Sequence, residues 1–291
     1  MAEDAQRAPL VIEERPAEGI ARLVINRPQA RNAQDLDLLY LLDDAFTRAA
    51  GADDVRVIIL AATDPHFSSG HDLRQSLDME TPERFRGHGV GGGSGEVGGY
   101  GYMAREEEVY LGLCNKWRNL AKPTIAAVQG KCIAGGLMLA WVCDMIVASD
   151  DALFMDPVVA MGVSGVEWFA HPWELGPRKA KELLMTGDAW TALEAHRLGM
   201  VNHVVPRGEL NAFTLALAAK IARQPAFALK AVKQSVNAML DAQGQKQAMD
   251  AAFNIHHLCH YHNMERFGTL GDPGGMPSMS KRADDTESKT T

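Results

Sequence analysis

Residues Thr124 to Asp144 read TIAAVQGKCIAGGLMLAWVCD and decide the fold class of the chain. The stretch begins with an apolar run typical of a buried strand, passes through Gly130 and the pair Gly135-Gly136, and ends in an apolar run that suits a buried helix. Glycine lets another group approach the main chain, and the free N–H groups of a helix start favour a negatively charged oxygen. The Gly-Lys-Ser/Thr of a nucleotide-triphosphate loop is absent. The stretch therefore predicts a strand, a glycine turn and a helix, which meet either a developing oxyanion or only a closely packed neighbour.

Composition and charge place the chain among ordinary globular proteins. Its 291 residues are 46% hydrophobic and 23% charged, which suits one large core or a core with a smaller appendage. The 29 basic and 37 acidic residues give a net charge of -8, which argues against general binding to nucleic acid or to anionic membranes. The longest apolar run, Ile133 to Cys143, is too short to span a bilayer. We therefore expect neither a nucleic-acid partner nor a membrane partner.

The four cysteines, Cys114, Cys132, Cys143 and Cys259, form no CxxC pair and no ligand-like cluster. This pattern indicates reduced, mostly buried thiols. The first residues, Met-Ala-Glu-Asp-Ala-Gln-Arg, lack the apolar core of a secretion signal. We therefore expect a cytoplasmic protein.

Upstream of the opening stretch, the sequence predicts two strands, a helix, a third strand and a second glycine turn. Leu10 to Glu13 and Ile20 to Asn26 alternate as a hairpin does, and residues 36–51 place apolar side chains on a broad helical face. Val55 to Ala61 reads as a buried strand and leads into the turn Phe67-Ser68-Ser69-Gly70-His71-Asp72-Leu73-Arg74. Two glycine turns that each follow a strand can form two walls of one site.

The remaining segments are predicted to be mostly helical. Gly87 to Gly101 matches GxGxxG twice, but neither match follows a predicted strand, which favours a mobile loop over a dinucleotide site. A helix over Arg105 to Leu120 leads into the opening stretch, and Val166 to Trp173 is predicted to be a further helix. Three amphipathic helices complete the pattern, over Glu209 to Arg223, Ala226 to Leu240 and Gln245 to Phe267.

Five groups of residues, in this order, resemble the enoyl-CoA hydratase/isomerase or crotonase superfamily over roughly residues 10–267. Each group alone is weak, but their order and spacing together are specific. They are Asn26-Arg27-Pro28 with Arg31-Asn32-Ala33, Phe67 to Leu73, Ala126 to Gly130 with Ala134-Gly135-Gly136 and Cys143-Asp144, Leu183 to Gly187, and Ala195 to Pro206.

The resemblance implies an α/β fold, a crotonase-like spiral of strand-strand-helix units with a C-terminal helical region. On this basis we expect an acyl-CoA-binding core over residues 10–206 and a helical trimerisation region over 207–267. Residues 1–9 and 268–291 are expected to be flexible tails. The resemblance also implies a homotrimer or a homohexamer.

The resemblance further implies an acyl-CoA thioester as the substrate. In the family, two backbone N–H groups hold the thioester oxygen as it becomes enolate-like, and by position these belong to His71 and Gly135. Fixed donors of this kind contribute roughly 3 to 4 kcal/mol each to transition-state binding. This expectation agrees with the oxyanion reading of the opening stretch.

The coenzyme A moiety is the only cofactor that the resemblance implies. Arg31 and Arg74 match positions where some members place arginines near the nucleotide phosphates, although both can also be solvated surface residues. The full set of expected contacts is Arg31, Ala33, Ser69, His71, Asp72, Leu73, Arg74 and Gly135. Asp72 also suits a hydrogen bond to the start of a following helix.

The chain departs from the family at the two glutamates with which a typical hydratase positions and activates water. Alignment on Cys143-Asp144 and on Phe154 to Pro157 places Met138 and Val158 at these positions. Neither side chain can move a proton, and general acid-base groups contribute roughly a hundred- to ten-thousand-fold each. We therefore expect ordinary hydration through these positions to be impaired.

Replacement groups are available nearby. If Val166 to Trp173 is helical, Glu167 and His171 share a face as a base and its partner, although Glu167 can also complement the helix dipole and His171 cap its far end. Asp156 is a second candidate for proton transfer or a turn aspartate before Pro157. His71 has an imidazole that can act near neutral pH or only line the pocket.

The sequence His256-His257-Leu258-Cys259-His260-Tyr261-His262 contains two histidines four residues apart, at His256 and His260. No carboxylate arrangement of a known type accompanies them, which favours a histidine-rich helix facing solvent or a partner subunit over a metal site. We therefore expect no metal.

Two classes of function follow from these residues. The first is an acyl-CoA-transforming enzyme of the enoyl-CoA hydratase/isomerase type that stabilises an enolate with the N–H groups of His71 and Gly135 and transfers protons with Glu167 or Asp156. A thioester hydrolase is the alternative within this class, because the same oxyanion pocket serves acyl transfer. The second class is a catalytically silent acyl-CoA-binding protein, which Met138 and Val158 favour.

Overall fold

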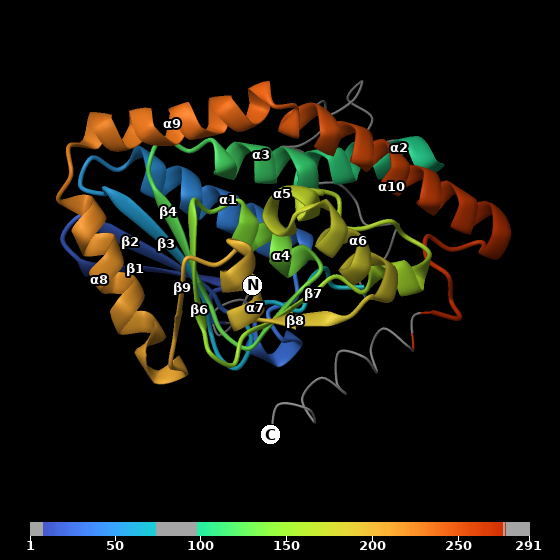
Figure 1. Ribbon diagram of the computed structural model, residues 1–291, viewed down its shortest axis with the longest axis horizontal. Coiled ribbons are helices and arrows are strands. Elements are labelled where there is room, and N and C mark those ends of the chain that lie inside the picture. The colour runs from blue at the N-terminus through green and yellow to red at the C-terminus, as the bar shows by residue number, and fades with distance from the viewer. Residues whose placement is uncertain (1–7, 74–97, 276, 278–291) are drawn as a thin grey trace, which may run out of the picture.

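The computed structural model describes residues 8–73, 98–275 and 277, and a six-stranded sheet in the order β1-β2-β3-β4-β6-β9 runs through it (Figure 1). β1 and β2 form the expected antiparallel hairpin, and the other neighbours are parallel. Every residue of β3 and β4 is buried, as is typical of parallel strands that are covered on both faces. The strands are β1 (Val11–Ala17), β2 (Ile20–Ile25), β3 (Val57–Ala62), β4 (Thr124–Val128), β6 (Met145–Ser149) and β9 (His203–Val205).

A second sheet of three short strands stands beside the first and carries the opening stretch toward its helix. Its order is β5-β7-β8, with β5 (Lys131–Ile133), β7 (Leu153–Met155) and β8 (Ala189–Thr191). The chain therefore passes from β4 through the short strand β5 into α4 (Gly135–Trp141). This is the strand-strand-helix unit implied by the resemblance, and the sequence pattern alone predicts its first strand and its helix but not β5.

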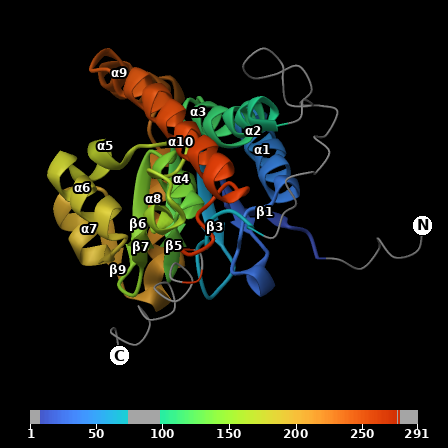
Figure 2. The same cartoon turned by 90° about the vertical axis from the view of Figure 1, so that its right-hand side faces the viewer.

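Helices cover both faces of the large sheet, because alternate side chains of each strand point to opposite sides. On one face Val57, Ile59 and Ala61 of β3 pack in a cluster with α8 (Leu210–Ala222). On the other face the intervening β3 residues join the main core with α1 (Leu36–Gly51), α3 (Leu113–Arg118) and α4. Two further helices, α6 (Pro177–Thr186) and α7 (Ala192–Leu198), lie beside the small sheet (Figure 2).

The helix expected over Arg105 to Leu120 begins earlier and changes type within its length. α2 (Gly98–Glu106) is followed by the π-helix η5 (Glu107–Gly112) and then by α3. The expected loop over Gly87 to Gly101 lies largely outside the described residues, and its described part, from Gly98 on, is helical.

The prediction of a helix over Val166 to Trp173 is wrong. The chain is irregular through residues 163–170, and only α5 (His171–Leu175) is helical. Gly165 has a φ of 153°, which interrupts a helix, and Pro172 suits the first turn of a helix rather than its interior. Glu167 and His171 therefore do not share a helical face.

The three C-terminal helices lie close to their expected bounds, as α8, α9 (Ala226–Ala242) and α10 (Gln245–Phe267). α10 runs alongside α2 in both views (Figures 1 and 2). Residues 268–275 do not leave the body as the expected tail, because the Asp272 N–H donates a 2.8 Å hydrogen bond to the Met161 carbonyl. The rest of both expected tails falls mainly outside the described residues.

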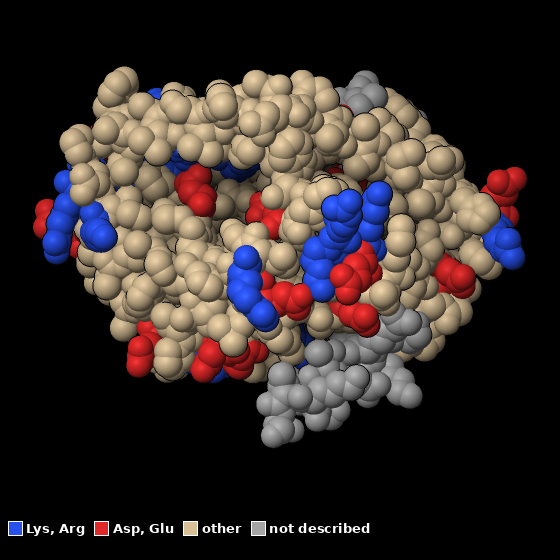
Figure 3. Space-filling view, viewed as in Figure 1, with Lys and Arg blue, Asp and Glu red and all other residues tan. Residues whose placement is uncertain are grey.

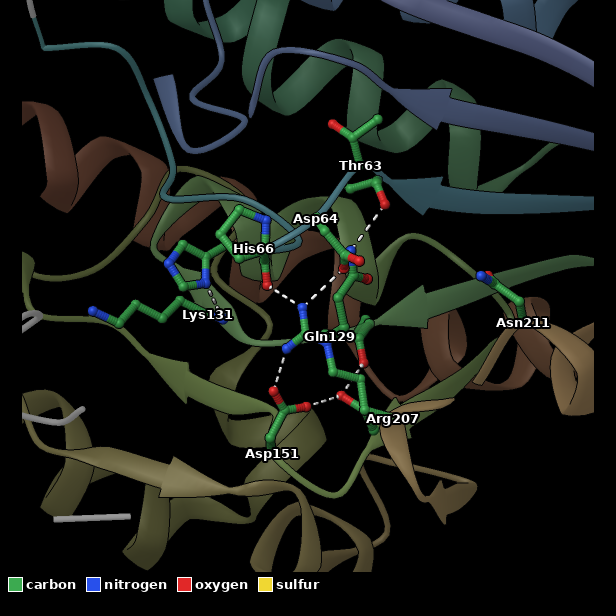
Figure 4. A network of polar contacts seen from close by, with 12 residues as sticks. Thr63, Asp64, His66, Gln129, Lys131, Asp151, Arg207 and Asn211 are labelled. Carbon is green, nitrogen blue, oxygen red and sulfur yellow. Dashed lines mark hydrogen bonds and ion pairs between the residues drawn. The ribbon is translucent and has the colours of Figure 1, made fainter. Parts of the chain in front are cut away.

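A polar network ties together the loops at the carboxyl ends of β3, β6 and β9 (Figure 4). Arg207, just after β9, pairs with Asp64 at 2.8 Å and also with Asp151. Gln129, after β4, donates to the Ala62 carbonyl at 2.8 Å. These contacts fix the loop from which the turn at residues 67–73 begins.

Charged side chains are spread over the visible surface of the molecule (Figure 3). Acidic and basic side chains are interspersed on the face shown in Figure 3, and few of them lie over α9 and the adjoining part of α10. Among the described residues, no helix is both long and apolar enough to cross a membrane. All four cysteines are free, and three of them are buried.

We expect Gly136→Ala to lower the free energy of unfolding by about 1–3 kcal/mol, because overpacking a tight contact forces the backbone to shift. A Cβ at Gly136 would lie 2.7 Å from the Ser68 carbonyl oxygen. Gly51→Ala is the matched control, since a Cβ there meets nothing within 4 Å and should change stability by less than about 1 kcal/mol. Denaturant unfolding followed by circular dichroism measures both, and equal losses would contradict the close approach.

Candidate active site

The two glycine turns lie against each other, and their glycines allow the approach. A Cβ at Gly70 would lie 2.9 Å from the Ile133 carbonyl oxygen and 3.2 Å from the Gly135 nitrogen. The bridge between Gln34 and His71 uses the Gly70 carbonyl and the Asp72 N–H, which leaves the His71 N–H outside this bridge. Gly135 is the first residue of α4, where an N–H has no acceptor within the helix. Two backbone donors thus lie on neighbouring turns.

A cavity of about 690 Å³ opens beside these turns. Its wall comes from the 69–73 turn, α2, η5, residues 157–167, α10 and the segment 269–273. The expected site residues that line it are Arg31, Ser69, His71, Asp72, Leu73 and Glu167. Ala33, Gly135 and Asp156 are buried and are not among the residues that line it, and Arg74 lies outside the described residues. The volume is in the range of small-molecule sites.

The His71 imidazole lies inside the site, directly over Gly135. A Cβ at Gly135 would lie 2.6 Å from Nε2 of His71, so the glycine makes room for this ring. The imidazole also stacks on Tyr110 of η5, with ring centroids 3.8 Å apart and an interplanar angle of 12°. Its Nδ1 lies 3.6 Å from Oε1 of Glu167. His71 therefore joins the backbone donors to a carboxylate.

Glu167 is a buried carboxylate aimed into the cavity. Only 4% of the residue is exposed, and its Oε1 lies 3.6 Å from both His71 Nδ1 and His256 Nε2. Within the described part of the chain, its Oε2 has no hydrogen-bond donor. The partners of Glu167 are thus His71 and His256, and not His171 as the helical pattern predicted.

Asp156 and His171 form a separate buried pair behind the cavity wall. His171 Nε2 lies 2.8 Å from Asp156 Oδ2, and the residues are 1% and 2% exposed. Asp156 also accepts a 3.1 Å hydrogen bond from the Val166 N–H. These contacts hold the irregular segment that carries Glu167, so the geometry gives Asp156 a positioning part and does not support it as a proton-transfer group.

Three histidines of α10 are buried inside the chain, which corrects the expectation of a helix face turned toward solvent or a partner. His256, His257 and His260 are 4%, 3% and 8% exposed. They surround Glu106, the last residue of α2, with ring Nε2 atoms 3.3, 3.2 and 3.9 Å from its Oε2. His256, His260 and Glu106 also line the cavity.

The charged groups in this cluster shift one another's pKa values. Burial alone would raise the pKa of Glu106, but the contacts with His256 and His257 hold it well below the ordinary carboxyl value. Burial alone would lower the pKa of His256, but Glu106 and Glu167 raise it to about 9. Burial, together with the charge of His256, lowers the pKa of His260. At neutral pH, His256 is therefore protonated beside an ionised Glu106.

Two phenols complete the polar part of the cavity wall. Burial raises the pKa of Tyr102 and Tyr110 well above the ordinary value, and the negative charges of Glu106 and Glu167 add to the shift. Both hydroxyls therefore stay neutral near pH 7. Sequence reasoning missed Tyr110 and Glu106, because nothing in the run Glu106-Glu107-Glu108 distinguishes the carboxylate that is turned inward.

Two of the expected coenzyme A contacts, Arg31 and Leu73, are exposed residues that line the cavity. Arg31 is exposed, and Leu73 is 52% exposed. Asp72 pairs with Arg27, whose Nη1 lies 2.7 Å from its Oδ2. The helix start to which Asp72 was expected to hydrogen-bond falls outside the described residues.

The two residues at the glutamate positions differ in location. Met138 of α4 is 2% exposed and belongs to the main core, and it does not line the cavity. Val158, in the 3₁₀ turn η6 (Val158–Met161), lines the cavity directly. An apolar side chain therefore occupies this part of the wall, and the carboxylates come from α2 and from the segment after Gly165.

Comparison with known proteins agrees with this architecture. The sequence profile of the enoyl-CoA hydratase/isomerase family matches residues 15–269. The Mycobacterium tuberculosis protein EchA13, whose name describes an enoyl-CoA hydratase, is 46% identical over 249 residues, which span 84% of this chain and 78% of that protein. A Mycobacterium smegmatis structure described as an enoyl-CoA hydratase is 47% identical, with a TM-score of 0.81 over 90% of this chain and 99% of that chain.

A second solved structure, described as a monofunctional enoyl-CoA isomerase from Mycobacterium smegmatis, is more distant. It is 26% identical, with a TM-score of 0.64 over 82% of this chain and 98% of that chain. The profile match and the identity to EchA13 each span well over half of the chain, and the first solved structure superposes on 90% of it with a TM-score of 0.81. The chain therefore belongs to the enoyl-CoA hydratase/isomerase family and has the crotonase fold.

Proposed function

We propose that the chain moves a carbon–carbon double bond in an enoyl-CoA thioester, with Glu167 as the base and the N–H groups of His71 and Gly135 as donors to the thioester oxygen. The observation that carries the proposal is the buried Glu167 carboxylate, which faces the cavity and lies 3.6 Å from the His71 imidazole that covers Gly135. The family supplies the acyl-CoA class of substrate.

Isomerisation suits a site with one carboxylate near the oxyanion donors. The base takes a proton from one carbon of the acyl chain, and the electron pair moves into the thioester carbonyl as an enolate. The same carboxyl then returns the proton to another carbon, so no atom is gained or lost. Hydration needs a second group to activate water, and the apolar Val158 lines the wall where the resemblance expects such a glutamate.

The surroundings of Glu167 support its part as a base. His256, with a pKa of about 9, places a positive charge 3.6 Å from the Glu167 carboxylate at neutral pH. His71 lies between Glu167 and the turn that would hold the thioester oxygen. The exposed Arg31 at the rim is the expected contact for the phosphates of coenzyme A.

We expect Glu167→Gln to lower kcat for double-bond migration in 3-enoyl-CoA thioesters by about 10²- to 10⁴-fold, with a small change in KM, because the amide keeps the shape and cannot accept the proton. Conjugated thioester absorbance follows the reaction. Asp156→Asn, a buried carboxylate behind the wall, is the comparison variant and should lower stability more than kcat.

Other outcomes of the same assay identify the alternatives. Turnover that is unchanged in Glu167→Gln would refute the assignment of the base. Release of free coenzyme A by the unchanged protein would instead identify a thioester hydrolase. Tight acyl-CoA binding without turnover across chain lengths would identify a binding protein that has kept the cavity and lost the chemistry.

We also propose that the chain assembles with itself, as a homotrimer or homohexamer, through α9 and α10. These helices expose many large apolar side chains in the single chain, and few charges lie over α9 and the adjoining part of α10 (Figure 3). Contiguous apolar surface of this kind favours association. The exposed residues are Phe227, Val232, Val236, Met239, Ile255, Leu258, Tyr261, Met264 and Phe267.

We expect the double variant Val236→Glu/Leu258→Glu to shift the protein to a smaller species, because charges would be buried in the interface. Sedimentation velocity measures the mass of the assembly. Leu193→Glu on α7 is the control, since Leu193 is 59% exposed and lies on another helix. An unchanged mass in the double variant would contradict assembly through these helices.

A further inference from the structure

We propose that Glu106, His256 and His260 bind a divalent transition-metal ion of the Zn²⁺ class in the wall of the acyl cavity. All three residues are buried, all three line the cavity, and one ligand atom of each lies within 4.8 Å of the others. The inference goes beyond the proposed function, because no step of the isomerisation requires a metal. Its test therefore succeeds or fails independently of the isomerase assay.

The spacing of the three ligand atoms is close to that of a tetrahedral site. Ligand atoms about 2.0–2.1 Å from Zn²⁺ lie about 3.3 Å from one another at the tetrahedral angle. Here Oε2 of Glu106 lies 3.3 Å from His256 Nε2 and 3.9 Å from His260 Nε2. The two Nε2 atoms are 2.8 Å apart, so a small separation of the two rings completes the geometry.

Main-chain carbonyls already orient both imidazoles for metal binding. His256 Nδ1 lies 2.7 Å from the Gly165 carbonyl oxygen, and His260 Nδ1 lies 2.7 Å from the Leu270 carbonyl oxygen. A carbonyl can only accept, so each Nδ1 carries the proton, and the neutral form of each ring has its lone pair on Nε2. This is the arrangement by which proteins fix the tautomer of a metal-binding histidine. Two lone pairs that face each other require a cation or a proton between them.

The carboxylates supply an independent indication of a cation site. Oε2 of Glu106 and Oε2 of Glu167 have no hydrogen-bond donor among the residues that the structure describes, and each residue is 4% exposed. The rings of His256 and His257 lie near Glu106 Oε2 without hydrogen-bond geometry. Buried carboxylate oxygens without donors are costly, and a metal ion would satisfy them.

The charge of the cluster also favours a divalent ion. Two ionised carboxylates and neutral imidazole rings have a net charge of two negatives. One imidazolium would halve this net charge, and one divalent cation would cancel it. Arg105 and Lys131 also line the cavity, so this balance counts only Glu106, Glu167 and the imidazole rings. Two imidazoles and a carboxylate suit Zn²⁺ and its transition-metal neighbours better than Mg²⁺ or Ca²⁺, which prefer oxygen ligands.

The fourth coordination position would face the cavity and Glu167. Oε1 of Glu167 lies 3.6 Å from His256 Nε2, within reach of an ion held by the other three groups. Structural zinc sites have four protein ligands, whereas sites with three keep one position for water or substrate. Glu167 can therefore be the fourth ligand of the ion, or the fourth coordination position can remain open to a ligand in the cavity.

The test uses the full chain without a histidine tag, stripped with a chelator and titrated with Co²⁺ and with Zn²⁺ alone. We expect one Co²⁺ per chain, with the absorption bands of a tetrahedral nitrogen and oxygen site. His260→Asn retains a short amide near Leu270 and removes the Nε2 ligand, and Glu106→Gln weakens the carboxylate ligand. Each should reduce affinity by at least about tenfold. His262→Asn, at an exposed position of the same helix, is the matched control.

Thermal unfolding gives a second readout that does not depend on activity. Zn²⁺ should raise the Tm of the unchanged protein and of His262→Asn, and it should raise the Tm of the two ligand variants less. Circular dichroism checks that each variant folds. Failure of the unchanged protein to bind Co²⁺ or Zn²⁺, or equal affinity in His260→Asn and His262→Asn, would overturn the proposal. A thiolate charge-transfer band would also overturn it, since Cys259 would then be the ligand.

Discussion

The close approach of two backbone turns is the constraint on which the site depends. Gly70 and Gly136 permit main chain to pack against main chain, and Gly135 leaves the space that the His71 ring fills. Parallel strands bring the two turns to the same edge of the sheet, since β3 and β4 are neighbours and both lead into them. The sheet itself therefore positions the two turns and the proposed backbone donors on them, and loops and helices supply the surrounding side chains.

The polar side chains of the cavity come from segments far apart in the sequence and are held by burial. Glu106 ends α2, Glu167 lies in an irregular segment, and His256 belongs to α10. The π-helix that follows Glu106 carries Tyr110 against the His71 ring, and π-helices are frequent at functional sites. Asp156 and His171 hold the irregular segment from behind. The segment that carries the proposed base, Glu167, is thus fixed by a second set of buried polar contacts.

Sequence reasoning found the elements whose signal is local. Glycines after apolar runs located both turns, and apolar periodicity located α9 and α10 to within two residues, because burial imposes these patterns along the chain. It failed for residues 163–170, where Gly165 and tertiary contacts override helical spacing. It also set aside a metal at His256 and His260, because the carboxylate beside them, Glu106, lies 150 positions earlier, and only the fold brings the three together.

His256 links the two proposals, because it lies beside the proposed base, Glu167, and is also one of the proposed metal ligands. Without a metal, Glu106 and Glu167 raise the pKa of His256 to about 9, so an imidazolium lies 3.6 Å from Glu167. With a metal, the His256 proton is displaced, and the ion itself becomes the cation beside Glu167. In both states a positive charge lies beside the Glu167 carboxylate. The two proposals are therefore compatible, because the proposed base has a cation beside it whether the cluster holds a proton or a metal ion.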